Sequence, residues 1–133
     1  MTPRDIALTW FTDVWNRRDV PLITTLMASN AIGHLAGPIP RIEGPEQFIV
    51  FQNELLAALP DIEVTILNSL GDETSAAVLW EAKALKGTVT FRGTTWFRIV
   101  DGKIVEGWDC WDHGALAAKL ANLKLDAEAA SVA

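Results

Sequence analysis

The sequence predicts a single α+β domain, in which helices pack against an antiparallel sheet. In the first 60 residues apolar side chains recur at helical spacing, whereas from residue 61 onward they alternate with polar ones. The chain of 133 residues, half of them hydrophobic, is long enough to bury one core. Helices followed by a run of hairpin-connected strands are typical of α+β domains.

Three helices are expected in the first 60 residues. Pro3 can occupy the first turn of a helix without losing a needed hydrogen bond, and Asp19 can cap a second, short helix. Pro45 can start the third helix. Between the second and third helices, glycines and prolines interrupt residues 30–45, so we expect a short strand and a loop there.

The second half of the chain is expected to form antiparallel strands, at residues 62–70, 76–85, 89–100 and 103–111. The dipeptide Asp101-Gly102 between the last two is a strong hairpin signal. Residues 114–125 follow a helical pattern and complete a single domain of residues 1–125. The alanine-rich segment 126–133 is expected to fray.

Composition and charge exclude several classes of function. Eleven Lys and Arg against seventeen Asp and Glu give a net charge of −6 without any basic run, which argues against a nucleic-acid partner. Charged residues interrupt every apolar run, so no membrane-spanning segment is expected. Cys110 is the only cysteine and no signal peptide is visible, so we expect a cytoplasmic protein without an intramolecular disulfide. The two histidines lack further ligands at metal-binding spacing, and we expect neither a metal nor another cofactor.

Three motifs resemble one known family. They are WNRRD at residues 15–19, IEGPEQF at 42–48 and FRIVDGKIVEGWDCWD at 97–112. Over about residues 4–120 the chain resembles the SnoaL-like polyketide cyclases of the nuclear transport factor 2-like superfamily. The resemblance implies a cone-shaped, curved antiparallel sheet packed against three helices, an architecture also called cystatin-like. This superfamily hosts isomerases, dehydratases, epoxide hydrolases, cyclases and non-catalytic binders, so the fold alone does not settle the activity.

Asp109 is the first candidate for catalysis. The resemblance implies that it is the general acid and base of an intramolecular aldol closure. From the residues themselves, strand alternation places Val105, Gly107, Asp109 and Trp111 on one face. A carboxyl between an apolar side chain and an indole is desolvated, which raises its pKa toward a useful range. The alternative is a structural role, as a hydrogen-bond acceptor near the end of a strand.

His34 is the second candidate, on the short strand expected near residue 34. The resemblance implies a histidine here that points into the cavity. Because imidazole titrates near neutrality, His34 could hold or pass a proton together with Asp109. The alternative is a structural histidine in an apolar core.

An apolar substrate pocket would draw on aromatic side chains and one hydroxyl, although each aromatic could equally be ordinary core. The candidates for substrate binding are Phe11, Trp15, Phe51, Trp80, Thr95, Phe97 and Trp111. Six Trp and five Phe occur without a single Tyr, so no phenol can stabilise an enolate as in ketosteroid isomerases. The short turn expected at residues 85–88 indicates a smaller or more open pocket than a large polyketide needs.

These observations favour a cofactor-independent cyclase, isomerase or lyase that acts on a small hydrophobic carbonyl compound. One alternative is a non-catalytic module for ligand binding or dimerisation. Another is a hydratase, epoxide hydrolase or isomerase of the same superfamily. The resemblance also implies a homodimer formed through the outer sheet face, where Trp96 is a suitable anchor.

Overall fold

The computed structural model describes residues 1–37 and 40–132. These residues form one six-stranded sheet in the order β2-β1-β6-β5-β4-β3. The strands are β1 (Met27–His34), β2 (Arg41–Glu43), β3 (Glu63–Gly71), β4 (Ser75–Ala84), β5 (Val89–Val100) and β6 (Lys103–Trp111). The helices are α1 (Pro3–Thr9), a π-helical turn (Trp10–Trp15), α2 (Val20–Leu26), α3 (Gly44–Ala58) and α4 (His113–Val132).

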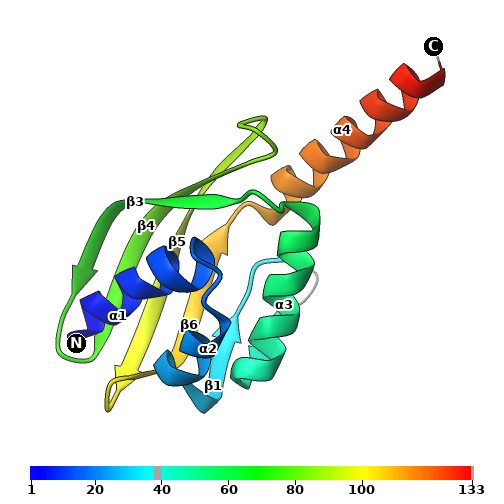
Figure 1. Cartoon of the computed structure of the whole chain (residues 1–133). Coiled ribbons are helices and arrows are strands. Elements are labelled where there is room, and N and C mark those ends of the chain that lie inside the picture. Colours follow the sequence, from blue (N-terminus) through cyan, green and yellow to red (C-terminus); the bar gives the residue numbers. More distant parts are fainter. Residues whose placement is uncertain (38–39, 133) are drawn as a thin grey trace.

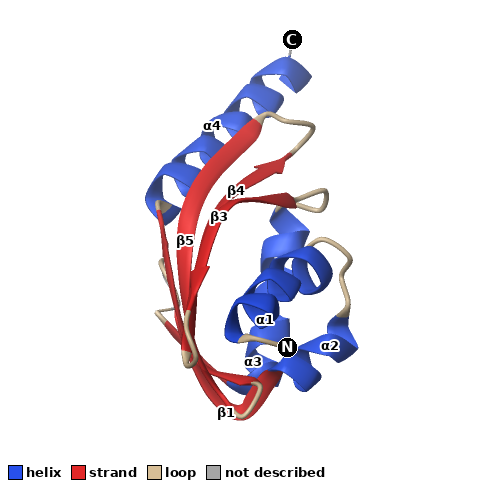
Figure 2. Cartoon of the chain, turned by 90° about the vertical axis from the view of Figure 1, so that its left-hand side faces the viewer, coloured by secondary structure: helices blue, strands red, loops and turns tan. Residues whose placement is uncertain are grey.

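The sheet is strongly curved, and α1, α2 and α3 fill its concave side (Figure 2). The fourth helix, α4, begins beside the C-terminal end of α3 and extends away from the domain (Figure 1). The predicted α+β class, with three helices against a curved sheet, is therefore confirmed. One pairing differs from the expected antiparallel sheet, because β1 runs parallel to β6. These two strands are far apart in the chain, so no tight turn forces them to run in opposite directions.

Most expected boundaries lie within a few residues of the observed ones. Thr2 and Asp5 cap α1 reciprocally, and the Asp19 side chain caps α2. The hairpin dipeptide Asp101-Gly102 has positive φ at both positions, as a type I′ turn requires. Helix α4 is longer than expected and continues to Val132, while residues 38–39 of the expected loop and residue 133 of the tail lie outside the described residues. In the described part of the chain, no helix is long and apolar enough to cross a membrane.

The WNRRD segment ties the N-terminal helices to the sheet. The Asn16 side chain donates to the Val64 carbonyl and accepts from the Val64 N–H, both at 2.8 Å, so it pairs with β3 as a strand would. Arg18, with a positive φ, donates to the Ile62 carbonyl at 2.9 Å. Asp19 then caps the next helix. Asn16, Arg18 and Asp19 of this motif therefore have structural roles, and their hydrogen bonds account for them without catalysis.

The first helix was expected to be a continuous α-helix, but its second half is π-helical. The N–H of Asn16 donates to the carbonyl of Phe11, five residues back, which widens the turn. Trp10 and Trp15 are therefore both buried on one side, and their rings pack against Phe48 with centroid distances of 4.7 and 5.8 Å. The wider turn brings two indoles to the wall of the cone.

Candidate active site

The inner face of β5 and β6 carries the candidate site. The strand register pairs Asp109 with Thr95 and Trp111 with Gly93. Side chains directly opposite each other in neighbouring strands lie on the same face, and alternate residues share it. Thr95 is 5% exposed, so this face is the one covered by the helices. The predicted inward orientation of Asp109 and Trp111 is confirmed.

A chain of two hydrogen bonds holds the Asp109 carboxyl. The Thr95 hydroxyl donates to Asp109 Oδ1 at 2.7 Å and accepts from Trp80 Nε1–H at 3.0 Å. Because the hydroxyl's hydrogen is given to the carboxyl and its oxygen is satisfied by the indole, Thr95 is held in one orientation. Trp80 lies on β4 and Thr95 on β5 of the same sheet, so strands hold the two side chains that position the carboxyl.

Burial raises the pKa of Asp109 from 3.8 to about 6, and the Thr95 hydrogen bond partly offsets this rise. The charged form is disfavoured because the described lining of the first cavity is apolar and includes no Lys or Arg beside the carboxylate. Near pH 6 the protonated and ionised forms are both well populated. A carboxyl in this state can take a proton at one step of a reaction and return it at another.

The carboxyl borders two small apolar cavities on the concave side of the sheet. The first has a volume of about 50 Å³ and the second about 40 Å³. Both are bordered by Trp10, Phe48, Thr95 and Asp109, and the Trp10–Phe48 ring contact of 4.7 Å lies between them. An apolar cavity of about 150 Å³ takes up a benzene molecule. Each cavity therefore admits only a small chemical group unless its side chains move.

The candidate substrate-binding residues gather around these cavities. The first cavity is lined by Phe11, Trp15, Phe51, Trp80, Thr95 and Trp111, and the second by Phe97 and Thr95. Phe91 also lines the first cavity, although it was not among the candidates. The sequence could have predicted this position, because strand alternation places Phe91 on the same face as Thr95 and Phe97.

Gly93 gives two large indoles room to enter the cavity wall. A Cβ atom at this position would lie 2.4 Å from the Trp80 ring and 2.8 Å from the Cβ of Trp111. Phe91, two residues earlier on β5, contacts both indoles, with centroid distances of 5.8 and 5.1 Å. A side chain at residue 93 would displace the ring that anchors Thr95, so this glycine supports the position of the carboxyl.

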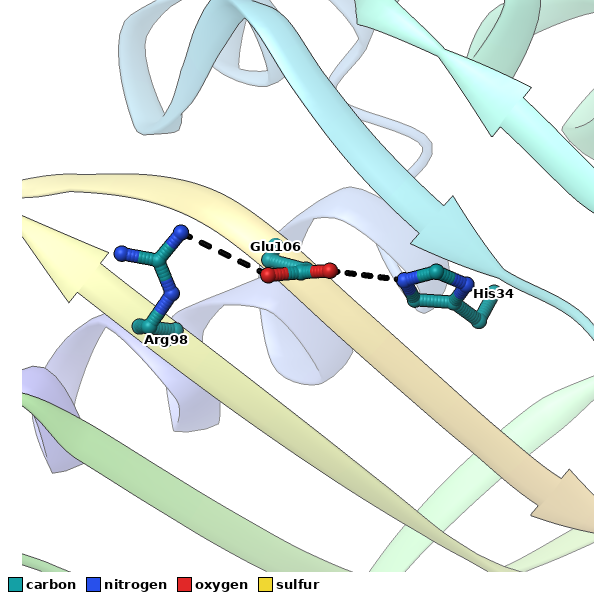
Figure 3. Close-up of polar contacts among 3 residues, drawn as sticks. All are labelled: His34, Arg98 and Glu106. Carbon is teal, nitrogen blue, oxygen red and sulfur yellow. Dashed lines mark hydrogen bonds and ion pairs between the residues drawn. The ribbon is translucent and has the colours of Figure 1, made fainter.

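His34 borders the second cavity together with Asp109, but its side chain is directed away from the carboxyl. Its register partner on β6 is Trp108, the neighbour of Asp109 in the chain, so the two side chains belong to opposite faces of the sheet. The imidazole stacks on the Trp108 ring at a centroid distance of 5.3 Å. Its Nε2 lies 2.7 Å from Glu106 Oε2, and Figure 3 shows Glu106 between His34 and Arg98. The expected cooperation of His34 with Asp109 is not supported by this geometry.

Glu106 links three neighbouring strands, β1, β6 and β5, on the outer face of the sheet. Its second oxygen lies 3.4 Å from the Arg98 guanidinium, and the hydrogen bond with His34 lowers the pKa of the Glu106 carboxyl. All three side chains are partly exposed. Among the residues that the structure describes, no group of three His, Cys, Asp or Glu side chains could hold a metal ion.

The sequence of residues 5–120 matches the family model of the SnoaL-like polyketide cyclases. The chain belongs to this family. A search of curated proteins gave no significant match. Among solved structures, a protein from Jannaschia sp. CCS1, described as a SnoaL-like polyketide cyclase, has 20% identity and a TM-score of 0.76, covering 87% of this chain and 89% of its own.

Two further structures are similar to this SnoaL-like chain. IdmH from Streptomyces antibioticus, described as a polyketide cyclase, has 21% identity and a TM-score of 0.76, covering 91% of this chain and 99% of its own. A protein from Kribbella flavida, described as a ketosteroid isomerase, has 27% identity and a TM-score of 0.71, covering 84% of this chain and 78% of its own. The similarity to IdmH shows a shared fold, and activity must be argued from the site.

Proposed function

We propose that this SnoaL-like protein is a cofactor-independent enzyme that moves a proton on a small hydrophobic carbonyl compound. Asp109 is its general acid and base. The proposal rests on one observation: a carboxyl with a pKa of about 6 borders apolar cavities and is held by Thr95. A group that titrates near the working pH can serve both proton-transfer steps.

Aldol-type cyclisation is our first choice within this class. The ionised Asp109 carboxylate takes a proton from a carbon between two carbonyl groups. The resulting carbanion forms a carbon–carbon bond with another carbonyl carbon of the same molecule, whose oxygen takes the proton back from Asp109. No atom is gained or lost, so the product is a cyclic isomer of the substrate.

The polar groups beside Asp109 favour a particular kind of carbon acid. The Thr95 hydroxyl hydrogen is already donated to Asp109, and the Trp80 N–H is donated to Thr95. Neither is free to stabilise a developing enolate. A carbon between two carbonyl groups spreads the negative charge over both oxygens, so it needs less help from the protein. We therefore expect a 1,3-dicarbonyl compound rather than a simple ketone.

Deuterium exchange tests the role of Asp109 without knowledge of the natural substrate. In D2O the protein should speed the incorporation of deuterium at the central carbon of ethyl 2-methylacetoacetate, followed by NMR. The rate should rise as pH passes about 6, because Asp109 becomes ionised. Asp109→Asn should lower the protein-dependent rate by at least about 100-fold. The matched control Asp112→Asn changes an exposed carboxyl that caps α4, and should keep the wild-type rate.

Two results would decide against this mechanism. If Asp109→Asn exchanges as fast as the wild type, Asp109 is not the base. If the wild-type protein binds the ester but does not speed exchange, the alternative of a non-catalytic binding module is supported. That alternative is favoured by one feature of the site, since Asp109 is the only side chain along the described lining of the first cavity that titrates near neutrality.

Two other superfamily activities have less support. A ketosteroid isomerase-like reaction is suggested by the name of the Kribbella relative, but this chain contains no Tyr to supply a phenol. An epoxide hydrolase of this superfamily would need an Arg beside two carboxylates. The described residues around the two cavities include one carboxylate and no Arg.

We also propose that two copies associate through the convex face of the sheet. A cross-strand row on this face contains Leu70, Ala77, Trp96, Trp108 and His34. Half of the Trp96 surface is exposed, as is most of the Leu70 surface, which is unusual for large apolar side chains in a row. Analytical ultracentrifugation should show a dimer for the wild type and a monomer for Trp96→Arg. An unchanged mass for this variant would contradict the proposed interface.

A further inference from the structure

A third apolar space, a groove, lies outside the concave side of the sheet, between α3 and α4. It has a volume of about 360 Å³, several times that of either inner cavity. In Figure 1 the start of α4 lies beside the C-terminal end of α3. The groove is lined mainly by Phe51, Leu55 and Ala58 of α3 and by Leu116, Ala117 and Leu120 of α4.

The groove is continuous with the wall of the first inner cavity. Phe51, Leu55 and Trp111 border both spaces. Trp111 lies on β6 two residues after Asp109 and on the same face, so it connects the carboxyl to the groove along one strand. Phe51, Leu55 and Trp111 therefore stand between the two spaces, and a ligand that contacts both Asp109 and α4 passes between these side chains.

The sizes of the two spaces assign different parts of a ligand to them. The inner cavity of about 50 Å³ admits a small polar group such as a carbonyl. The groove of about 360 Å³ exceeds the roughly 150 Å³ that hold a benzene ring. An apolar chain or ring attached to the reacting group thus fits the groove but not the inner cavity, whose described walls are closely packed.

We propose that the groove between α3 and α4 binds the uncharged apolar tail of the substrate while its dicarbonyl head reaches Asp109. This inference rests on the proposed function and names the substrate class: a 1,3-dicarbonyl compound with an extended hydrophobic tail. Glu54 and His113 are the polar side chains in the described lining, and Glu54 is exposed. Together with the net charge of −6, Glu54 disfavours a tail that ends in a carboxylate.

A homologous series of methyl 3-oxoalkanoates tests the groove. Affinities for methyl acetoacetate and for its C6, C8 and C10 homologues are measured by isothermal titration calorimetry. Each added methylene that is buried in the groove should strengthen binding by up to about fourfold. A chain of the same length that ends in a carboxylate should bind more weakly than the uncharged one. Equal affinity across the series would overturn the proposal.

Blocking variants distinguish the groove from other apolar surface. Ala117→Trp fills the groove from α4 and should abolish the dependence on chain length, with methyl acetoacetate still bound as by the wild type. Ala58→Trp fills it from α3 and should give the same result if the first variant disturbs α4. The matched control Ala118→Trp adds an indole to an exposed position of α4 outside the groove, and should keep the dependence. If affinity still rises with chain length in both Ala117→Trp and Ala58→Trp, the tail binds elsewhere.

The two proposals fail in different ways. Asp109→Asn should lose deuterium exchange but keep the dependence of affinity on chain length, because the tail does not contact the carboxyl. If the wild type catalyses exchange but binds all chain lengths equally, the proposed groove is refuted and the role of Asp109 is not. If affinity rises with chain length but the wild type does not speed exchange, the role of Asp109 is refuted, and the groove would then belong to a binding protein.

Discussion

The charge on Asp109 should make the stability of the fold depend on pH. Burial raises its pKa to about 6 in the folded protein, against 3.8 for the ordinary carboxyl. The folded state therefore binds this proton more tightly than the unfolded state does. Stabilisation by Asp109 is complete below about pH 4 and is lost as pH rises through about 6. The difference between the two pKa values corresponds to about 3 kcal/mol of unfolding free energy, most of which falls between pH 4 and 7.5.

The Asp109→Asn variant isolates this contribution. Asn is neutral at all pH values, so any change in hydrogen bonding that its NH2 group causes alters stability by an amount that does not depend on pH. The informative quantity is thus the change with pH in the difference between the two proteins. Between pH 4 and 7.5 the wild type should lose about 2–3 kcal/mol relative to the variant, measured by urea unfolding at each pH.

Other carboxyl groups act in the opposite direction and must be subtracted. Backbone N–H groups lower the pKa of Asp61 and of Asp72, so their stabilisation is lost as pH falls. Both groups are present in wild type and variant alike, and their effects cancel in the difference. If the pH-dependent difference for Asp109→Asn stays within about 0.5 kcal/mol across this range, the reasoning from burial is refuted.

Three further substitutions, one of them with a matched control at Gly107, test the surroundings of the carboxyl and the strands and helices that hold it. Thr95→Val removes the hydrogen bond that lowers the pKa of Asp109, so NMR titration should give a value above about 6. Gly93→Ala places a methyl group 2.4 Å from an indole carbon and should destabilise the fold by about 1–3 kcal/mol in urea, whereas Gly107→Ala has 3.6 Å of clearance and should stay within about 0.5 kcal/mol. Asn16→Ala leaves two strand groups unpaired and should lower stability by about 1–3 kcal/mol; wild-type stability would contradict the clamp.

The inward position of Asp109 could be predicted because the side chains of β6 alternate regularly between the two faces of the sheet around this residue. The register with β5 is continuous from Glu106 to Trp111, and its irregularity lies before this stretch, between Arg98 and Ile99. The same irregularity explains a local difference from expectation. Ile104 rather than Val105 is fully buried, because one residue at the start of β6 has no partner.

The orientation of His34 could not be obtained in this way. Its strand is apolar on both sides, with Ala31, Ile32, Gly33 and Leu35 around the histidine, so no alternation indicates which face is inward. The structure shows that Gly33 faces inward, because an added Cβ would lie 2.9 Å from the buried Ile42 side chain. His34 must then face outward. The π-helical turn was also missed, since an α-helical pattern does not reveal one wider turn.

The energetics of Asp109 argue that the fold does not need this carboxylate. At neutral pH the ionised carboxyl lowers stability by about 3 kcal/mol, even after the Thr95 hydrogen bond has offset part of its desolvation. A neutral acceptor at residue 109 could satisfy the same hydroxyl without the desolvation cost. A residue that lowers the stability of the fold and has no structural role is expected at a functional site. The same reasoning does not extend to Glu106, whose charge is stabilised by His34 and Arg98 on the outer face.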